Sequence, residues 1–204
     1  MQYFALLISK EDVLTPAATG ARITGGPDAP IVTDGPFAES AEVACGYYVF
    51  EAENLDEALA LARDIPVATY GAVEVWPMAG GPGSAPQPLE GTNWIALLLE
   101  PPDRPVPPGT PEWDAMVVQH QQFGAAAGQH IRGGAGLHPP STATTVRVRD
   151  GEALITDGPY AEGAEVANGF YVLHASDRDE AAKVASMIPA TAVELRQLAG
   201  VSHL

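Results

Sequence analysis

Two aspartates and one histidine are the residues with the clearest capacity for chemistry. Asp34 and Asp157 each stand in a Thr-Asp-Gly-Pro-aromatic-Ala-Glu segment, and the two segments lie 123 residues apart. His120 falls on the inward stripe of a predicted helix. A carboxylate beside an imidazole fixes the ring tautomer and raises the basicity of the distal nitrogen, so His120 with Asp157 would suit general acid/base catalysis.

Each of these residues also has a purely structural interpretation. His120 would then be a core histidine bonded to a backbone carbonyl, and the aspartates would be turn carboxylates that accept backbone N–H bonds. For Asp34, which has no histidine partner in its own half of the chain, we favour the structural corner. Arg147, Tyr160 and Phe123 are candidate substrate-binding residues, although core packing or solvation would also account for them.

Other classes of site find little support. Cys45 is the only cysteine, and its place beside a predicted strand is more typical of a small buried residue than of a nucleophile. His130 and His138 flank a glycine-rich stretch, but the spacing of the histidines matches no local metal motif. That stretch follows a helix rather than opening one, the reverse of a phosphate-binding loop. We therefore expect neither a metal nor a cofactor.

The composition limits the classes of partner that the protein can bind. A net charge of −16, with only ten Lys and Arg among 204 residues, argues against nucleic acid and against an anionic membrane surface. The longest apolar runs are too short to span a bilayer, and the N-terminus lacks the basic lead of a signal peptide. We expect a soluble, cytoplasmic protein whose partner is a small molecule.

The chain is a tandem repeat whose first copy is shorter. The first strand, residues 2–9, repeats at an offset of 91, whereas the Asp-Gly-Pro corner and all that follows repeat at 123. The first copy has therefore lost 32 residues, which correspond to about 100–136. We expect a truncated unit at residues 1–80, a Gly/Pro-rich linker at 81–92 and a complete unit at 93–204.

The lost piece contains the only candidate first helix. Thr110 is a good N-cap and Pro111 suits the first helical position, while the glycine-rich residues 132–136 predict the end of the helix and a loop. Each copy then has a hairpin, a strand, a second helix and a last strand. The second helices begin at the capping residues Asn54 and Asp177. This order predicts an α+β fold close to a ferredoxin-like unit.

The run TDGPxAExAEVAxGYYV, with its Asp-Glu-Ala helix, Ile-Pro stop and final Ala-Val-Glu strand, resembles the YCII-related family in its DGPF-motif branch. The resemblance covers nearly all of the second copy and about two-thirds of a unit in the first. It implies ferredoxin-like units that pair sheet to sheet into an α+β barrel, here an internal pseudo-dimer, with further homodimerisation left open. It also implies an active site made of His120 and Asp157.

Two hypotheses follow. In the first, the protein is a small-molecule enzyme that uses His120 and Asp157 for cofactor-independent proton transfer. It would act as a lyase or isomerase on a small substrate, with or without a carboxylate group. Some relatives in the family resemble lyases or dehydrochlorinases of ring-cleavage products. In the second, it is a non-catalytic module that binds a small ligand or another protein, and the repeated corner serves the fold alone.

Overall fold

A computed structural model of the chain describes residues 1–10, 19–35, 43–80, 90–102, 106–160 and 165–199. Within these ranges the fold is α+β, with eleven strands in one antiparallel sheet and three α-helices. Most of the predicted linker, residues 81–89, lies outside the described residues, as do Pro36 to Glu39 of the first corner and Ala161 and Glu162 of the second. No described helix has the length and apolar character needed to cross a membrane.

The described part of the first copy contains one α-helix. Asn54 caps this helix, because its side chain accepts a hydrogen bond from the backbone N–H of Glu57 at 3.0 Å. The elements in chain order are β1 (Gln2–Ser9), β2 (Ala21–Thr24), β3 (Ile31–Asp34), β4 (Val43–Glu51), α1 (Leu55–Arg63) and β5 (Ala72–Gly80).

The second copy contains two α-helices. Thr110 caps the first by accepting from the N–H of Trp113 at 3.2 Å, and Asp177 caps the second by accepting from Glu180 at 2.9 Å, as the sequence predicts. The elements are β6 (Asn93–Glu100), α2 (Pro111–Ala127), β7 (Ile131–Leu137), β8 (Thr144–Arg149), β9 (Glu152–Asp157), β10 (Val166–His174), α3 (Arg178–Ala185) and β11 (Ala192–Gln197).

The glycine-rich residues 132–136 form a strand rather than the predicted loop. They belong to β7, which pairs with β10 and, at its end, with β5. The glycines are needed because aromatic side chains lie directly against this strand. A Cβ at Gly136 would approach Trp113 of α2 to 3.1 Å, and one at Gly134 would approach the Tyr171 ring to 2.8 Å. The described residues of the first copy therefore contain neither a counterpart of β7 nor one of α2.

The two copies exchange their hairpins. The strand order is β3-β2-β11-β6-β10-β7-β5-β1-β4, with β8 beside β5 and β9 beside β8. Hairpin β2–β3 of the first copy thus extends the strands of the second copy at β11, and hairpin β8–β9 of the second copy extends those of the first at β5. Each copy completes the sheet of the other.

Arginines hold both hairpins to the copy that receives them. Arg149 at the end of β8 donates to the carbonyls of Ala68 and Gly71 in the first copy, at 3.0 and 3.1 Å. Arg178 at the start of α3 donates to the Asp34 carboxylate at 2.6 Å and to the Gly20 carbonyl at 3.2 Å. The exchange is therefore supported by side chains as well as by strand pairing.

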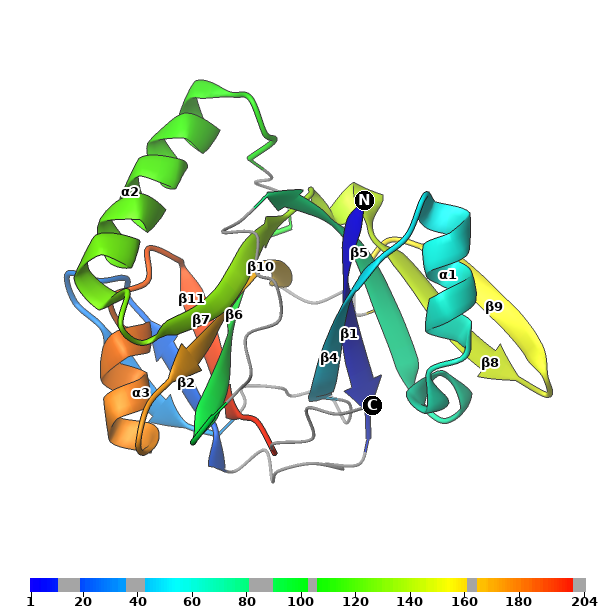
Figure 1. Cartoon of the computed structure of the whole chain (residues 1–204), viewed down its shortest axis with the longest axis horizontal. Coiled ribbons are helices and arrows are strands. Elements are labelled where there is room, and N and C mark those ends of the chain that lie inside the picture. The colour runs from blue at the N-terminus through cyan, green and yellow to red at the C-terminus, as the bar shows by residue number, and fades with distance from the viewer. Residues whose placement is uncertain (11–18, 36–42, 81–89, 103–105, 161–164, 200–204) are drawn as a thin grey trace.

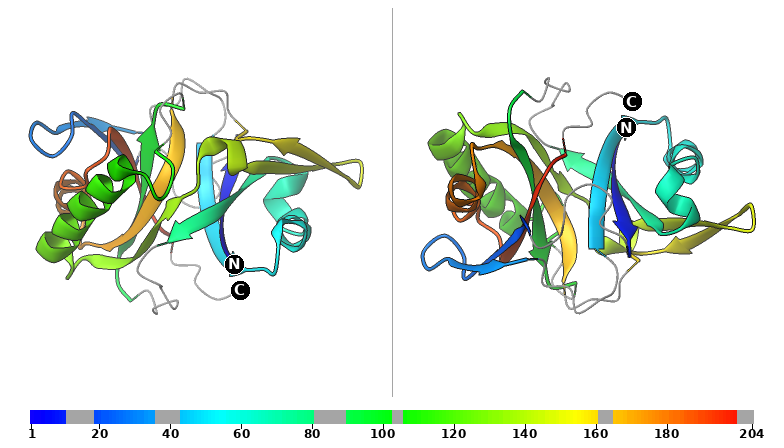
Figure 2. Two further views of the ribbon diagram at one scale, coloured as in Figure 1. Left: turned by 90° about the horizontal axis from the view of Figure 1, so that it is seen from above. Right: turned by 90° about the horizontal axis from the view of Figure 1, so that it is seen from below.

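The sheet folds back on itself at β5, so that its two halves face each other. Strands β4, β1, β5, β8 and β9 form one half-sheet, called the A half, and β7, β10, β6, β11, β2 and β3 form the other, the B half (Figures 1 and 2). Between them lies an apolar layer centred on Phe4 and Phe170, whose rings stack at 4.4 Å. Helix α1 covers the outer face of the A half, and α2 and α3 cover that of the B half.

Candidate functional site

His120 lies on α2, on the side that faces β10, and Tyr171 is its hydrogen-bonding partner. The Nδ1 atom of His120 is 2.9 Å from the Tyr171 hydroxyl, and Phe123 packs edge-on against the Tyr171 ring at 5.0 Å. Burial lowers the pKa of His120 below its usual 6.5 and raises the pKa of Tyr171 to about 12. The pair is therefore an uncharged hydrogen bond at neutral pH.

Replacing His120 by glutamine is expected to flatten the pH dependence of stability. Because the folded pKa lies below the unfolded value, the stability that His120 contributes is complete above about pH 6.5 and falls as the pH drops toward the folded pKa. Urea unfolding at about pH 7.5 and about pH 5.5 measures this loss. All other ionisable groups are the same in the two proteins, so equal losses in wild type and His120→Gln would contradict the expectation.

Asp157 ends β9 in the A half, and the corner that follows it is bound both within its own copy and to the first copy. The Gly158 N–H donates to the Ala143 carbonyl at 2.9 Å, and the Thr145 hydroxyl donates to the Gly158 carbonyl at 2.9 Å. The Tyr160 N–H donates to the Glu74 carboxyl at 2.8 Å. The second Asp-Gly-Pro corner is thus a fixed junction between the two copies.

Arg147 and Tyr160, two of the predicted substrate-binding residues, lie at the same junction between the copies. The guanidinium of Arg147 lies 5.4 Å from the centre of the Tyr160 ring, which is a cation–π contact. The buried Nε atom of Arg147 has no hydrogen-bonding partner among the described residues. Tyr160 also packs against the apolar layer between the two half-sheets.

Glu74 is a site residue that the residue pattern did not single out. It is 4% exposed on β5 and also accepts from the Trp76 indole N–H at 3.1 Å. Burial raises its pKa, while the hydrogen bonds from Tyr160 and Trp76 oppose that rise. The sequence does contain a pattern that could have identified it, because a glutamate interrupts the apolar last strand of both copies, at Glu74 and Glu194.

The exchange of hairpins places His120 and Asp157 on different halves of the sheet. Helix α2 covers the B half, whereas β9 is the outermost strand of the A half (Figure 1). The described hydrogen bonds and ion pairs join His120 to Tyr171, and none joins it to Asp157. Asp34, expected to be a structural corner, lies on the same half as α2 and forms an ion pair with Arg178.

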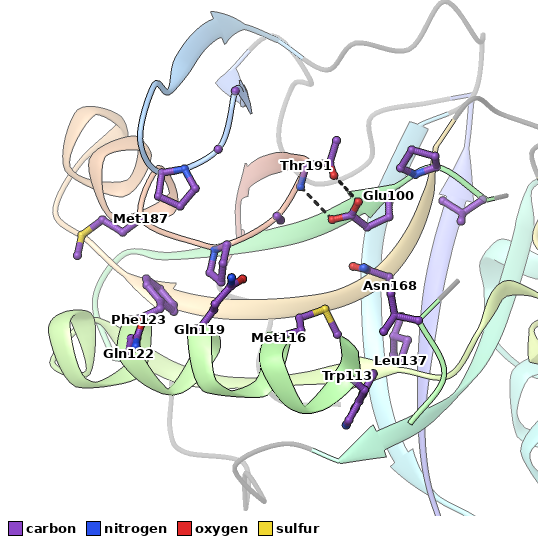
Figure 3. Close-up of a pocket in the computed structure, with 18 of the residues that line it drawn as sticks. Glu100, Trp113, Met116, Gln119, Gln122, Phe123, Leu137, Asn168, Met187 and Thr191 are labelled. Carbon is purple, nitrogen blue, oxygen red and sulfur yellow. Dashed lines mark hydrogen bonds between the residues drawn. The ribbon is translucent and has the colours of Figure 1, made fainter. Parts of the chain in front are cut away.

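A cleft of about 980 Å³ opens beside α2 and draws its walls from both copies. One wall is the face of α2 adjacent to His120, and another is the tip of hairpin β2–β3 from the first copy (Figure 3). The floor is formed by the start of β10 and the end of β7. Of the predicted site residues, Phe123 alone lines this cleft. Its charged, amide and large apolar lining side chains include Asp28, Glu100, Trp113, Met116, Phe123 and Asn168.

Asn168 is directed into the cleft by a β-bulge. The register between β10 and β6 slips between Ala167 and Gly169, which leaves Asn168 as the extra residue. The same irregularity separates β4 from β1 at the matching position, where the first copy has Cys45. The repeat thus preserves the bulge but changes its side chain, and only the copy with α2 has an amide there.

Glu100 provides the second polar group of the cleft. Its carboxylate accepts from the Thr191 N–H at 2.9 Å and from the Thr191 hydroxyl, and these bonds hold it in place (Figure 3). Within the described ranges, no three His, Cys, Asp or Glu side chains gather closely enough to hold a metal ion. The cleft can therefore offer hydrogen-bond acceptors and apolar walls to an organic ligand.

Comparison with known proteins gives two matches. The model of the YCII-related domain matches the chain twice, over residues 8–79 and 103–199. An uncharacterized protein of Rhizobium meliloti (strain 1021) is 41% identical over 68 residues, which cover 32% of this chain and 55% of that protein. The match thus spans just over half the length of the relative, and the name of that relative states no activity.

Proposed function

Because the chain belongs to the YCII-related family, and because a cleft with polar and aromatic walls opens beside α2, we propose that it binds a small organic molecule there. The observation that carries the proposal is the cleft itself. Its volume falls in the range of ligand pockets, and its lining combines apolar side chains with a few oriented polar groups.

The proposed architecture is a pair of ferredoxin-like units that form an internal pseudo-dimer, with the boundaries 1–80, 81–92 and 93–204. The order β7-β10-β6-β11, with helices after β6 and β10, supports this assignment for the second unit. The order β4-β1-β5 supports the same unit without its edge strand for the first. In this view the hairpins are additions to the units, and each is donated across the pseudo-dimer.

The deletion in the first copy explains why we propose a single site. A cleft of this kind needs α2 as a wall and β7 as part of its floor, and the part of the first copy that the structure describes contains neither counterpart. It still contributes the hairpin tip, residues 25–28, to the site of the second copy. The truncated unit would therefore complete the binding site rather than carry one of its own.

Proton transfer is the second candidate function, as a lyase or isomerase. The observation that favours it is the hydrogen bond between His120 and Tyr171, because Phe123 contacts Tyr171 on one side and lines the cleft on the other. His120 directly follows the cleft-lining residue Gln119, and a neutral imidazole is chemically competent as a base. In this proposal Tyr171 is the immediate partner of His120, and Asp157 would act only from the other half of the sheet.

Filling the cleft is expected to abolish binding of small aromatic molecules. Gln119 and Gln121 are both exposed on α2, but only Gln119 lines the cleft, so Gln119→Trp blocks it and Gln121→Trp is the matched control. A saturation-transfer NMR screen of neutral aromatic fragments, tryptophol among them, measures the effect. We expect hits for wild type and Gln121→Trp that are lost with Gln119→Trp; hits unaffected by Gln119→Trp would refute the cleft as the site.

A further inference from the structure

We propose that the ligand of the cleft is a primary amine, bound as its ammonium ion, on an apolar or aromatic body. This inference rests on the proposed function and names the chemical class of the molecule. It is carried by three features of the described lining: the sign of its charges, the orientation of one carboxylate, and one buried oxygen without a donor.

The charged side chains of the described lining have one sign. Asp28 and Glu100 are carboxylates, and the lining described here contains no lysine or arginine, with His138 as its one other titratable group. A carboxylated or phosphorylated ligand would therefore meet like charge in the cleft. The net charge of −16 acts in the same direction, because the field of the whole protein concentrates cations at such a site.

Glu100 is held in position by Thr191 and keeps unused hydrogen-bond acceptor positions. Its Oε1 atom accepts from the Thr191 N–H and its Oε2 atom from the Thr191 hydroxyl. A carboxylate has about four acceptor positions, so about two remain for a donor in the cleft. Because Thr191 already orients the group, an incoming ammonium would not have to order it.

Asn168 supplies an acceptor beside Glu100. Its Oδ1 atom is buried, and the described residues offer it no hydrogen-bond donor. A buried acceptor without a partner costs free energy, which a donor from a ligand would recover. Asn168 and Glu100 both project into the cleft from neighbouring strands (Figure 3). Two acceptors on one side match the several N–H donors of an ammonium group.

The opposite side of the cleft fits the body of such a molecule. Trp113, Met116 and Phe123 project from α2, and Met187 follows α3 (Figure 3). Aromatic and thioether groups of this kind pack well against a planar apolar ligand. The arrangement thus separates a polar end, at Glu100 and Asn168, from an apolar wall.

Three matched indoles test the inference by isothermal titration calorimetry on the full chain. Tryptamine, tryptophol and indole-3-propanoate share one ring but end in an ammonium, a hydroxyl and a carboxylate. We expect tryptamine to bind about tenfold more tightly than tryptophol, since charge-assisted hydrogen bonds are about twice as strong as neutral ones. Indole-3-propanoate is expected to bind most weakly.

Glu100→Gln is expected to remove the preference for tryptamine while retaining the affinity for tryptophol, because the change removes the charge and keeps the shape. Glu152→Gln, on the exposed hairpin β8–β9, is the control and should leave both affinities unchanged. The ratio of the affinity for tryptamine to that for tryptophol is measured within each variant. If Glu100→Gln fails to fold, Asp28→Asn at the exposed hairpin tip is a second variant that removes a negative charge from the cleft.

The outcomes separate the inference from the proposed function. If tryptophol or indole-3-propanoate binds in the cleft at least as tightly as tryptamine, the amine inference is wrong and the binding function stands. If tryptamine is preferred equally by wild type and Glu100→Gln, the inference is also wrong. If none of the three indoles binds, or if Gln119→Trp leaves their binding intact, the proposed function itself fails.

Discussion

Replacing Glu74 by alanine is expected to lower the free energy of unfolding by about 4 kcal/mol. The change removes the carboxyl that accepts from the partly buried Tyr160 N–H and from the buried Trp76 indole N–H. It also opens a cavity in β5 beside the layer between the half-sheets. Both losses occur where the second corner meets the first copy, so the junction between the copies weakens as well. Urea unfolding followed by fluorescence measures the effect.

Two comparisons make the Glu74 result specific. Glu74→Gln keeps the volume and one acceptor, so it should cost clearly less than the alanine variant. Glu152→Ala removes an exposed glutamate of β9 and should change the free energy of unfolding by at most about 0.5 kcal/mol. If Glu74→Ala were as mild as Glu152→Ala, the buried carboxyl would not hold the corner.

Gly134→Ala is expected to cost about 3 kcal/mol. A Cβ at this position would lie 2.6 Å from the Phe170 carbonyl oxygen and 2.8 Å from the Tyr171 ring, and the first of these is a backbone atom that cannot move aside. The backbone φ of +157° adds to the cost. Because β7 would shift from β10, the His120–Tyr171 hydrogen bond should weaken too. Thermal and urea unfolding measure the loss.

Gly124→Ala is the matched control on the neighbouring element. Gly124 lies inside α2, and a Cβ there would meet nothing within 4 Å. Alanine in a helix interior is favoured over glycine, so this variant should be more stable by about 0.5 to 1 kcal/mol. Opposite signs for the two glycines are the expected result. A neutral Gly134→Ala would contradict the explanation given for the glycine-rich strand.

Local features of the fold follow from the sequence because their causes are local. The caps Asn54, Thr110 and Asp177 each accept the bond that their residue type predicts. The Asp150-Gly151 turn adopts φ values of +54° and +83°, as a two-residue hairpin requires. The repeat and the missing first helix could be inferred from alignment offsets alone.

Long-range features could not be inferred in this way. The exchange of hairpins depends on which sheet edge each hairpin meets in space, and a tandem repeat offers two equivalent edges, β5 and β11. The glycine-rich strand β7 was predicted as a loop because glycine opposes regular structure on its own, whereas Trp113 and Tyr171 require it there. Both the exchange of hairpins and the strand β7 depend on contacts between residues that are distant in the sequence.

Only part of the candidate site could be predicted from the sequence, for the same reason. The inward stripe of α2 identified Phe123 and the environment of His120, but the cleft also needs Glu100 from β6, Asn168 from a bulge and a hairpin tip from the other copy. None of these has a motif of its own. Asn168 and Cys45 occupy matching positions in the repeat, and that difference between the copies is a usable signal.

The most direct test of this account is the map of backbone amide NMR shifts when tryptophol is added to the full chain. We predict that the shifts gather at the walls of the cleft, on the hairpin tip at residues 25–28, on α2 at Met116 and Gln119, and around Asn168. Shifts on both the hairpin tip and α2 would show a site built from both copies. Shifts that gather instead around Asp157 and Tyr160, with the cleft unchanged, would contradict it.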